Sequence, residues 1–90
     1  MNILTEADGL TGGDRHKAYG PPGVEFASVA SLWSDLLGTT VQPYQVPLCM
    51  ILLKMVRYQY SQGRDSLVDI AGYARTIEMM EQECQGASSQ

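Results

Sequence analysis

Two pairs of opposite charge stand on either side of a short polar turn in this ninety-residue chain. Lys54 and Arg57 are three residues apart before the turn, and Asp65 and Asp69 are four residues apart after it. Residues at either spacing share one face of a helix. A tight helical hairpin would therefore set a basic pair against an acidic pair, in a chain that is only 18% charged.

These charges allow two kinds of ligand chemistry and one structural role. Lys54 and Arg57 can hold a ligand's phosphate, because both are cations that donate hydrogen bonds to its oxygens. Asp65 and Asp69 can bind Mg²⁺ through carboxylate oxygens, with water and ligand phosphates completing the octahedron. In the structural role, Asp65 caps a helix and Asp69 pairs with one of the two cations. Tyr73, which follows them, either borders an apolar face or stacks on a base.

A second charged cluster lies near the N-terminus. Arg15, His16 and Lys17 are followed within two residues by Tyr19. A loop of this composition can wrap the phosphates of a ligand while the aromatic ring stacks on a base. The alternative is a solvated arm without a ligand. Because residues 1–23 are rich in glycine and proline and lack apolar periodicity, we predict an arm with little regular structure.

After this arm, apolar residues recur at helical spacing in three segments, and no strand-like alternation is present. The predicted helices cover about 22–37, 43–60 and 65–83. We therefore expect an all-α fold: a three-helix, antiparallel bundle-like protomer. The domain would span residues 24–83 and end in a frayed polar tail over 84–90.

The middle helix is apolar on almost every side between Val46 and Val56. Such a helix lies either in the centre of a core or at an interface between subunits. A chain of ninety residues is too short to surround it with its own side chains. We therefore expect a homo-oligomer, a dimer or a higher assembly.

Composition excludes several other classes of protein. The net charge is −4 and the six basic residues are scattered, which disfavours a reader of duplex nucleic acid. The single histidine and two cysteines provide neither a zinc motif nor a disulfide framework. No apolar run is long enough to span a membrane, and Met1–Leu10 does not resemble a signal peptide. A cytoplasmic protein is expected. No Ser-His-Asp or Cys-His pattern predicts covalent catalysis.

Several segments together resemble a small-protein family of uncharacterised function that is common in bacteriophages. The resemblance covers roughly residues 15–77. Its segments, in order, are Arg15…Tyr19-Gly20, Glu25-Phe26…Leu32-Trp33, Met50-Ile51…Lys54…Arg57, and the most specific, Asp65-Ser66-Leu67-Val68-Asp69-Ile70-Ala71-Gly72-Tyr73-Ala74. That family is in turn distantly similar to the all-α nucleoside triphosphate pyrophosphohydrolases of the MazG and dimeric dUTPase kind.

This second similarity implies an oligomeric helical protein that handles nucleotides. The hydrolases bind Mg²⁺ through a Glu-x-x-Glu motif on one helix and a Glu-x-x-Asp-like motif on the next. Asp65 and Asp69 lie in the region of the second motif, at a spacing of four rather than three. Lys54 and Arg57 stand where the two glutamates of the first motif would be expected. This replacement removes half of the metal cage and increases attraction for phosphate.

Three hypotheses follow, in our order of preference. The first is an oligomer that binds a phosphorylated nucleotide between helices without hydrolysing it. By analogy with phage proteins that sequester nucleotide immune signals, it would act in the cytoplasm of an infected bacterium. The second is a Mg²⁺-dependent pyrophosphohydrolase in which Asp65, Asp69 and Glu25 hold the ion. The third is a structural oligomer with no small ligand and therefore no cofactor.

Overall fold

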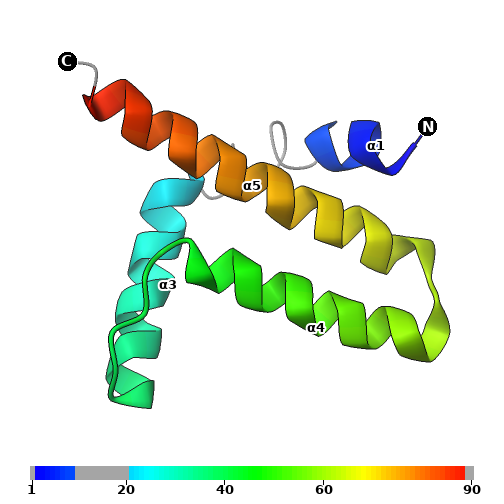
Figure 1. Cartoon of the computed structure of the whole chain (residues 1–90), viewed down its shortest axis with the longest axis horizontal. Coiled ribbons are helices and arrows are strands. Elements are labelled where there is room, and N and C mark those ends of the chain that lie inside the picture. The colour runs from blue at the N-terminus through cyan, green and yellow to red at the C-terminus, as the bar shows by residue number, and fades with distance from the viewer. Residues whose placement is uncertain (1, 10–20, 89–90) are drawn as a thin grey trace.

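The structure is a computed structural model that describes the backbone of residues 2–9 and 21–88, and the side chains of these ranges up to residue 83. The described part is all helical, as predicted. It contains four helices rather than three: α1 (Ile3–Gly9), α3 (Pro22–Leu37), α4 (Gln45–Ser61) and α5 (Arg64–Ser88), shown in Figure 1. The additional helix, α1, lies within the segment that we predicted to be irregular.

Helices α4 and α5 form an antiparallel hairpin, as the sequence predicted. Gly63 is not the residue that closes the first of these helices. Instead Gln62 takes the left-handed conformation, with φ 49° and ψ 36°, and its N–H donates to the Tyr58 carbonyl at 2.7 Å. Helix α5 then begins at Arg64, so Asp65 lies inside its first turn rather than at the capping position.

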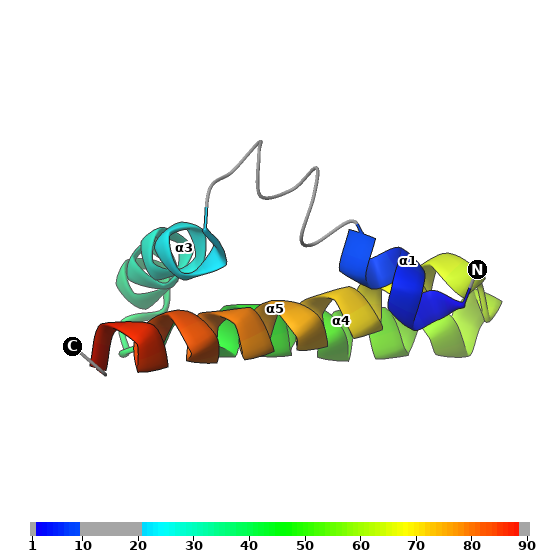
Figure 2. The same ribbon diagram turned by 90° about the horizontal axis from the view of Figure 1, so that it is seen from above.

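Helix α3 crosses the hairpin instead of lying antiparallel to it, which corrects the predicted three-helix bundle (Figure 1). Its bounds agree with the prediction. Pro22 occupies the first turn, and Gly38 ends the helix with φ 69° while its N–H donates to the Ser34 carbonyl. Figure 2 shows α1 and α3 on the same side of the layer formed by α4 and α5.

The core of the protomer is small. Phe26 and Ala30 of α3 meet Val46 at the start of α4, and each is at most 4% exposed. Half-buried side chains surround this cluster, namely Val29, Trp33, Val41, Tyr73 and Met80. Pro47 is also buried, and it falls in the first turn of α4, where its missing N–H has no helical partner. The core therefore joins the N-terminal parts of α3 and α4 to the C-terminal half of α5.

Helix α5 buries a narrow line of small side chains. Val68, Gly72 and Thr76 are buried at a spacing of four, and the Thr76 hydroxyl donates to the Gly72 carbonyl at 2.8 Å. The other apolar residues that recur at helical spacing here are half-buried except for Ala74, which is exposed; they are Leu67, Ile70, Ala71, Ala74 and Ile77. The helix also continues through Ser88, into the segment predicted to be a tail.

Helix α1 is held against α5 by one buried side chain and two ion pairs. Ala7 is 2% exposed. Arg64 pairs with Glu6 at 2.8 Å, and Arg75 pairs with Asp8 at 3.0 Å. A helix of seven residues is marginal by itself in water, so these tertiary contacts stabilise it.

Candidate functional site

An ion pair joins the two helices of the hairpin near the middle of α4. The Lys54 Nζ atom lies 2.8 Å from Asp69 Oδ2. The Lys54 side chain is only 15% exposed and that of Asp69 is 39% exposed, so the pair is partly shielded from water. The structure thus brings together one cation and one carboxylate of the predicted constellation. This contact is also the structural role that the sequence allowed for Asp69.

The other two charges of the constellation are not joined. Arg57 and Asp65 are both exposed, and neither forms an ion pair within the described part of the chain. Arg57 follows Lys54 by three residues on the same helix, so its guanidinium is a second cation beside the pair, open to solvent. The sequence predicted that the basic pair would lie opposite the acidic pair. The structure shows one such contact, between Lys54 and Asp69.

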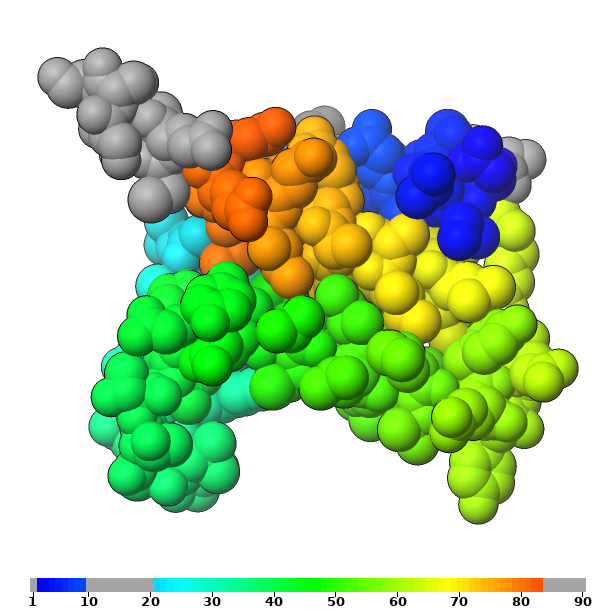
Figure 3. All heavy atoms as spheres, viewed as in Figure 1, coloured from blue at the N-terminus to red at the C-terminus, as the bar shows by residue number. Residues whose placement is uncertain are grey.

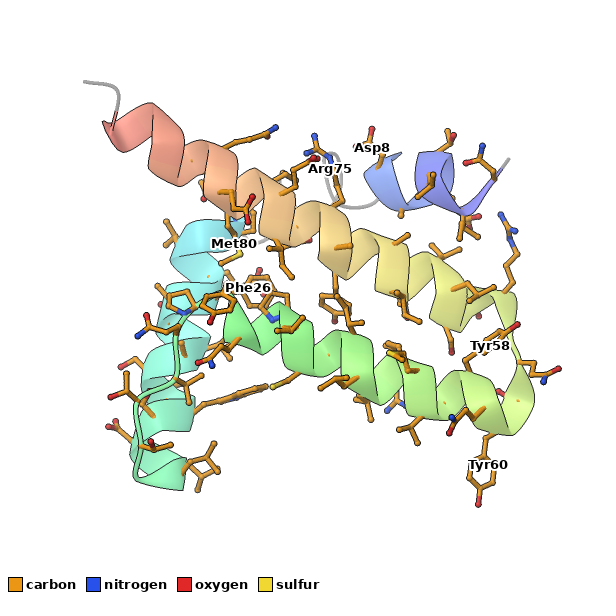
Figure 4. The ribbon with its side chains drawn as sticks, in the orientation of Figure 1. Asp8, Phe26, Tyr58, Tyr60, Arg75 and Met80 are labelled. Atoms are coloured by element: carbon orange, nitrogen blue, oxygen red, sulfur yellow. The ribbon has the colours of Figure 1, made fainter. Side chains whose placement is uncertain are left out.

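The tyrosines of the hairpin differ in their surroundings. Tyr73 packs against the core cluster of Phe26, Ala30 and Val46, so its ring has a structural role in this conformation. Tyr58 is half-buried, and Tyr60 is 92% exposed and points away from both helices (Figure 4). Of the two sequence alternatives for Tyr73, the boundary of an apolar face agrees better with this packing than a stacking platform does.

The four predicted ligand-binding residues of the arm, Arg15, His16, Lys17 and Tyr19, lie outside the described residues. What the structure gives is the position of the flanking elements. Helix α1 ends at Gly9 and α3 begins at Pro22, and both lie on the same side of the α4–α5 layer (Figure 2). The arm therefore leaves from and returns to one face of the hairpin.

The described carboxylates do not meet the needs of a Mg²⁺ ion. The described side chains contain no group of three or more histidine, cysteine, aspartate or glutamate residues placed to hold a metal. Asp69 is already neutralised by Lys54, which leaves Asp65 as the carboxylate without an ion-pair partner. Because Mg²⁺ usually needs carboxylates whose charge is available to it, this donor set does not fit the ion. We derive no chemical step through a metal.

One shallow cleft lies away from these charges, and the sequence did not reveal it. It holds about 460 Å³ and is lined almost entirely by apolar atoms, from α3, from the connection into α4 and from α5. At its edge, the Glu83 carboxylate accepts a hydrogen bond from the Gly23 N–H at 3.1 Å. An acidic side chain of α5 thus satisfies a free donor at the N-terminus of α3. This contact links elements sixty residues apart, which no local pattern could predict.

Among the described residues, one titratable group with a shifted pKa belongs to the contact between α1 and α5. The hydrogen bond from the Arg75 side chain to Asp8 raises the pKa of the guanidinium, and nearby Glu78 acts in the same direction. Arginine is already fully protonated at physiological pH, so this shift reports a structural contact rather than an acid–base catalyst.

These features define a small, all-helical protein with one partly shielded ion pair. A family model described as "Domain of unknown function (DUF6378)" matches residues 2–81, and the chain belongs to that family. It is 39% identical over 83 residues to "Gene 55 protein" of Mycobacterium phage D29, covering 91% of this chain and 55% of the relative. It is 37% identical over 83 residues to "Gene 55 protein" of Mycobacterium phage L5, covering 90% of this chain and 53% of the relative.

These comparisons confirm the predicted resemblance to a phage family of uncharacterised function. They do not extend to the pyrophosphohydrolases of the MazG kind. The chain spans about half the length of the curated relatives that it matches. No solved structure matches it significantly. Within the described ranges, no helix is long and apolar enough to cross a membrane.

Proposed function

We propose that the protein binds a phosphorylated nucleotide at the α4–α5 hairpin without hydrolysing it. The observation that carries this proposal is the Lys54–Asp69 ion pair beside the exposed guanidinium of Arg57. An ammonium group has three N–H donors, and Asp69 is within hydrogen-bonding distance of Lys54 through one oxygen. The remaining donors of Lys54 and the fork of Arg57 suit the oxygens of a phosphate.

Asp69 would act as a positioning residue in this site. A free lysine side chain has about 2 kcal/mol of rotamer entropy, part of which is lost when the ammonium is held in one place. The ion pair imposes that loss during folding, before any ligand arrives. Ordering a donor in advance improves binding, because the ligand no longer has to order it. The same carboxylate partly cancels the positive charge, so Arg57 supplies most of the attraction for an anion.

The arm completes the proposed site. Arg15, His16 and Lys17 would add contacts to the phosphates, and Tyr19 would stack on the base. What supports this arrangement is that both elements flanking the arm lie on one face of the hairpin. Because deletion of residues 1–20 would also remove α1 with its ion pairs, Arg15→Ala with Lys17→Ala is the sharper test. This double variant should weaken binding at least tenfold.

The proposal can be tested by identifying the ligand and then removing its contacts. Mass spectrometry of small molecules released from the purified protein comes first, followed by titrations with ribonucleoside triphosphates and cyclic nucleotides. Arg57→Ala should weaken binding of the identified nucleotide by roughly 10- to 150-fold, since hydrogen bonds to charged groups contribute about 1.5–3 kcal/mol. Arg75→Ala is the matched control, because it removes the same charge from the contact with α1. Equal losses in both variants would reject the site.

The second candidate is a Mg²⁺-dependent nucleoside triphosphate pyrophosphohydrolase. It is favoured by Asp65, which is exposed, lies one turn from Asp69 and has no ion-pair partner among the described residues. This hypothesis expects chelator, Asp65→Asn and Asp69→Asn each to abolish turnover, whereas Lys54→Ala mainly raises KM. The binder expects chelator to change affinity little. Release of a nucleoside monophosphate that stops with chelator would replace our proposal with this one.

The biological setting is also a proposal. The phage origin of the relatives supports a role in an infected bacterial cytoplasm, where sequestration of a nucleotide immune signal would need binding without turnover. We further propose that the protein acts as a homo-oligomer.

A structural oligomer without a ligand remains the third candidate. It predicts that no small molecule accompanies the purified protein and that Arg57→Ala has no effect on any titration.

A further inference from the structure

The side of α4 that faces away from α5 is apolar and exposed. We call it the outer face; it consists of Leu48, Cys49, Leu52, Leu53, Met55, Val56 and Tyr60. Leu52 is 58% exposed, Val56 is 57% exposed and Tyr60 is 92% exposed. These residues recur at three- and four-residue spacing, so they form one continuous surface of the helix. Gln45, in the first turn, and Gln59 also fall within this arc, and no charged residue lies in it.

A second apolar surface adjoins the outer face at α3. Phe26, Ala30, Trp33 and Leu37 share one side of that helix at helical spacing. Phe26 and Ala30 are buried and Trp33 is half-buried, but Leu37, at the end of the same line, is 63% exposed. The core-facing line of α3 therefore continues beyond the core of its own protomer. Leu36 lies roughly 90° around the helix from this line and Leu32 lies farther round, and both are also exposed.

The two surfaces border a hollow. In Figure 1, the C-terminal half of α3 projects past α4, which runs away from it at a steep angle. The space-filling view in Figure 3 shows the same arrangement as a concave edge below α4, with the end of α3 on one side and the hairpin turn on the other. Tyr60 projects on the side of the hollow that is formed by the hairpin turn (Figure 4). A partner that fills this hollow would contact both helices.

The apolar area agrees with the needs of a stable dimer. Side chains of this size present roughly 60–120 Å² of apolar area each when fully exposed. The exposed fractions along the outer face and the end of α3 correspond to between about five and six such side chains, or roughly 300–700 Å². A standard interface buries about 800 Å² on each partner, of which about 65% is apolar in homodimers, or about 520 Å². A patch of this size is comparable to the largest apolar patch of a typical monomer, roughly 300–600 Å², and such a patch is often functional.

The charge of the surface favours a second copy of this chain as the partner. A two-fold contact brings each residue near the axis close to its own copy, so a charged side chain there would meet a like charge. The outer face has no charged residue, so two copies can face each other along most of α4 without bringing like charges together. A partner of opposite charge would find no complementary group on the face.

We infer that two copies of the chain associate through their outer faces, with the two α4 helices antiparallel across a two-fold axis near Leu52 and Val56. The two hairpins then form one row of helices in the order α5, α4, α4, α5, with the two α4 helices at its centre. In this orientation Tyr60 of one copy lies over the N-terminal half of the other copy's α4. It therefore reaches the hollow beside the α3 end of that copy, where Leu36 and Leu37 are exposed. The inference concerns assembly only and is independent of nucleotide binding.

The assembly can be tested by sedimentation equilibrium of the whole chain between about 1 and 100 μM. The wild type should have twice the mass of the 9.9 kDa monomer at the upper concentrations. Leu52→Glu should raise the dimer dissociation constant at least 100-fold while the circular dichroism spectrum stays helical, because Leu52 is exposed in the protomer. Leu4→Glu is the matched control: Leu4 is 69% exposed on α1, and its replacement should leave the dimer intact.

A cross-link tests the orientation. One protein carries Leu36→Cys and the other carries Tyr60→Cys, both in a background in which Cys49 and Cys84 are replaced by serine. Mild oxidation of the mixture should yield the mixed disulfide faster than either symmetric one. A wild type that stays monomeric, or a Leu52→Glu variant that dimerises as tightly as the wild type, would overturn the inference. A monomer that floats with phosphatidylcholine vesicles would instead assign the outer face to a lipid surface.

Discussion

Both sides of α4 are largely apolar, but only one of them is covered within the protomer. Its inner side, toward α5, carries the amine of Lys54, which is 15% exposed. Its outer side carries leucine, methionine and valine that are 40–58% exposed. A helix on the surface of a monomer normally buries its apolar side and exposes its charges. Large apolar side chains that stay exposed along one side of a helix are what we expect where that side packs against a partner, as in the dimer inferred above.

The two sides also differ in how many partners each residue has. On the inner side, Lys54 has one fixed partner, and Val46 packs against two helices. On the outer side, the largest side chains contact little within the protomer. The core that remains is thin, because Phe26, Ala30 and Val46 are its only clustered buried residues in the described part of the chain. The stability of this fold should therefore depend on protein concentration.

The largest effect is expected in a comparison of two variants of α4, one with a negative charge on the inner side and one with a negative charge on the outer side. Val46→Glu would bury an unpaired carboxylate at a position that is 2% exposed, and it should cost more than about 4 kcal/mol. This cost is comparable to the whole stability of a domain of this size, so the helical signal in circular dichroism should be lost. Leu52→Glu should retain the helical signal at low temperature and lose only the assembly.

Both variants must be compared at the same protein concentration, because dissociation alone lowers the apparent stability of a dimer. If Val46→Glu and Leu52→Glu lose helical structure to the same extent, the outer face would belong to the core, and the distinction between the two sides would be wrong.

A smaller effect is expected at the ion pair of the inner side. Asp69→Asn should leave the shielded amine of Lys54 without its counter-charge and destabilise the protein by about 2 kcal/mol in urea unfolding. We place the value below the 3–5 kcal/mol of a fully buried pair, because Asp69 is 39% exposed and water screens the interaction.

The double variant Lys54→Met with Asp69→Leu provides the control. Replacing both partners by apolar side chains of similar size removes the unpaired charge, so most of the lost stability should return. Arg57→Ala, which removes an exposed cation one turn away, should change stability by less than about 0.5 kcal/mol. If the double variant were less stable than Asp69→Asn, the attraction between Lys54 and Asp69 would itself stabilise the hairpin. The loss in Asp69→Asn could then not be explained by the unpaired charge of Lys54.

The helices and the contact between Lys54 and Asp69 could be predicted because they follow from local spacing. Amphipathic periodicity and Gly38 gave the bounds of α3, and the short turn gave the hairpin. The same periodicity could not place α3 across the hairpin, because the crossing depends on how Phe26 and Ala30 meet Val46. It also could not show that Arg57 and Asp65 stay apart, since side chains at the end of a hairpin diverge into solvent.

Helix α1 was missed for a different reason. The only local signal was Asn2, whose side chain accepts a hydrogen bond from the Thr5 N–H at 2.8 Å, as a capping residue does. The glycines that follow are typical of an irregular segment, and a helix of seven residues has little pattern of its own. The capping signal alone was therefore too weak to predict it. What stabilises the helix is its contact with Arg64 and Arg75, which are about sixty residues away in the chain. Such long-range pairs are not readable from a single sequence.

The smallest expected effect concerns the turn that joins α4 to α5. Gln62 has φ 49°, a conformation that costs a residue with a Cβ atom about 1 kcal/mol and costs glycine little. Its N–H donates to the Tyr58 carbonyl, and glycine would keep that hydrogen bond because it uses only the main chain. Gln62→Gly should therefore raise stability by about 0.5–1 kcal/mol in urea unfolding. Ser61→Gly, at the last residue of α4, should lower it by a similar amount. If Gln62→Gly were destabilising, the left-handed turn would not be what closes α4.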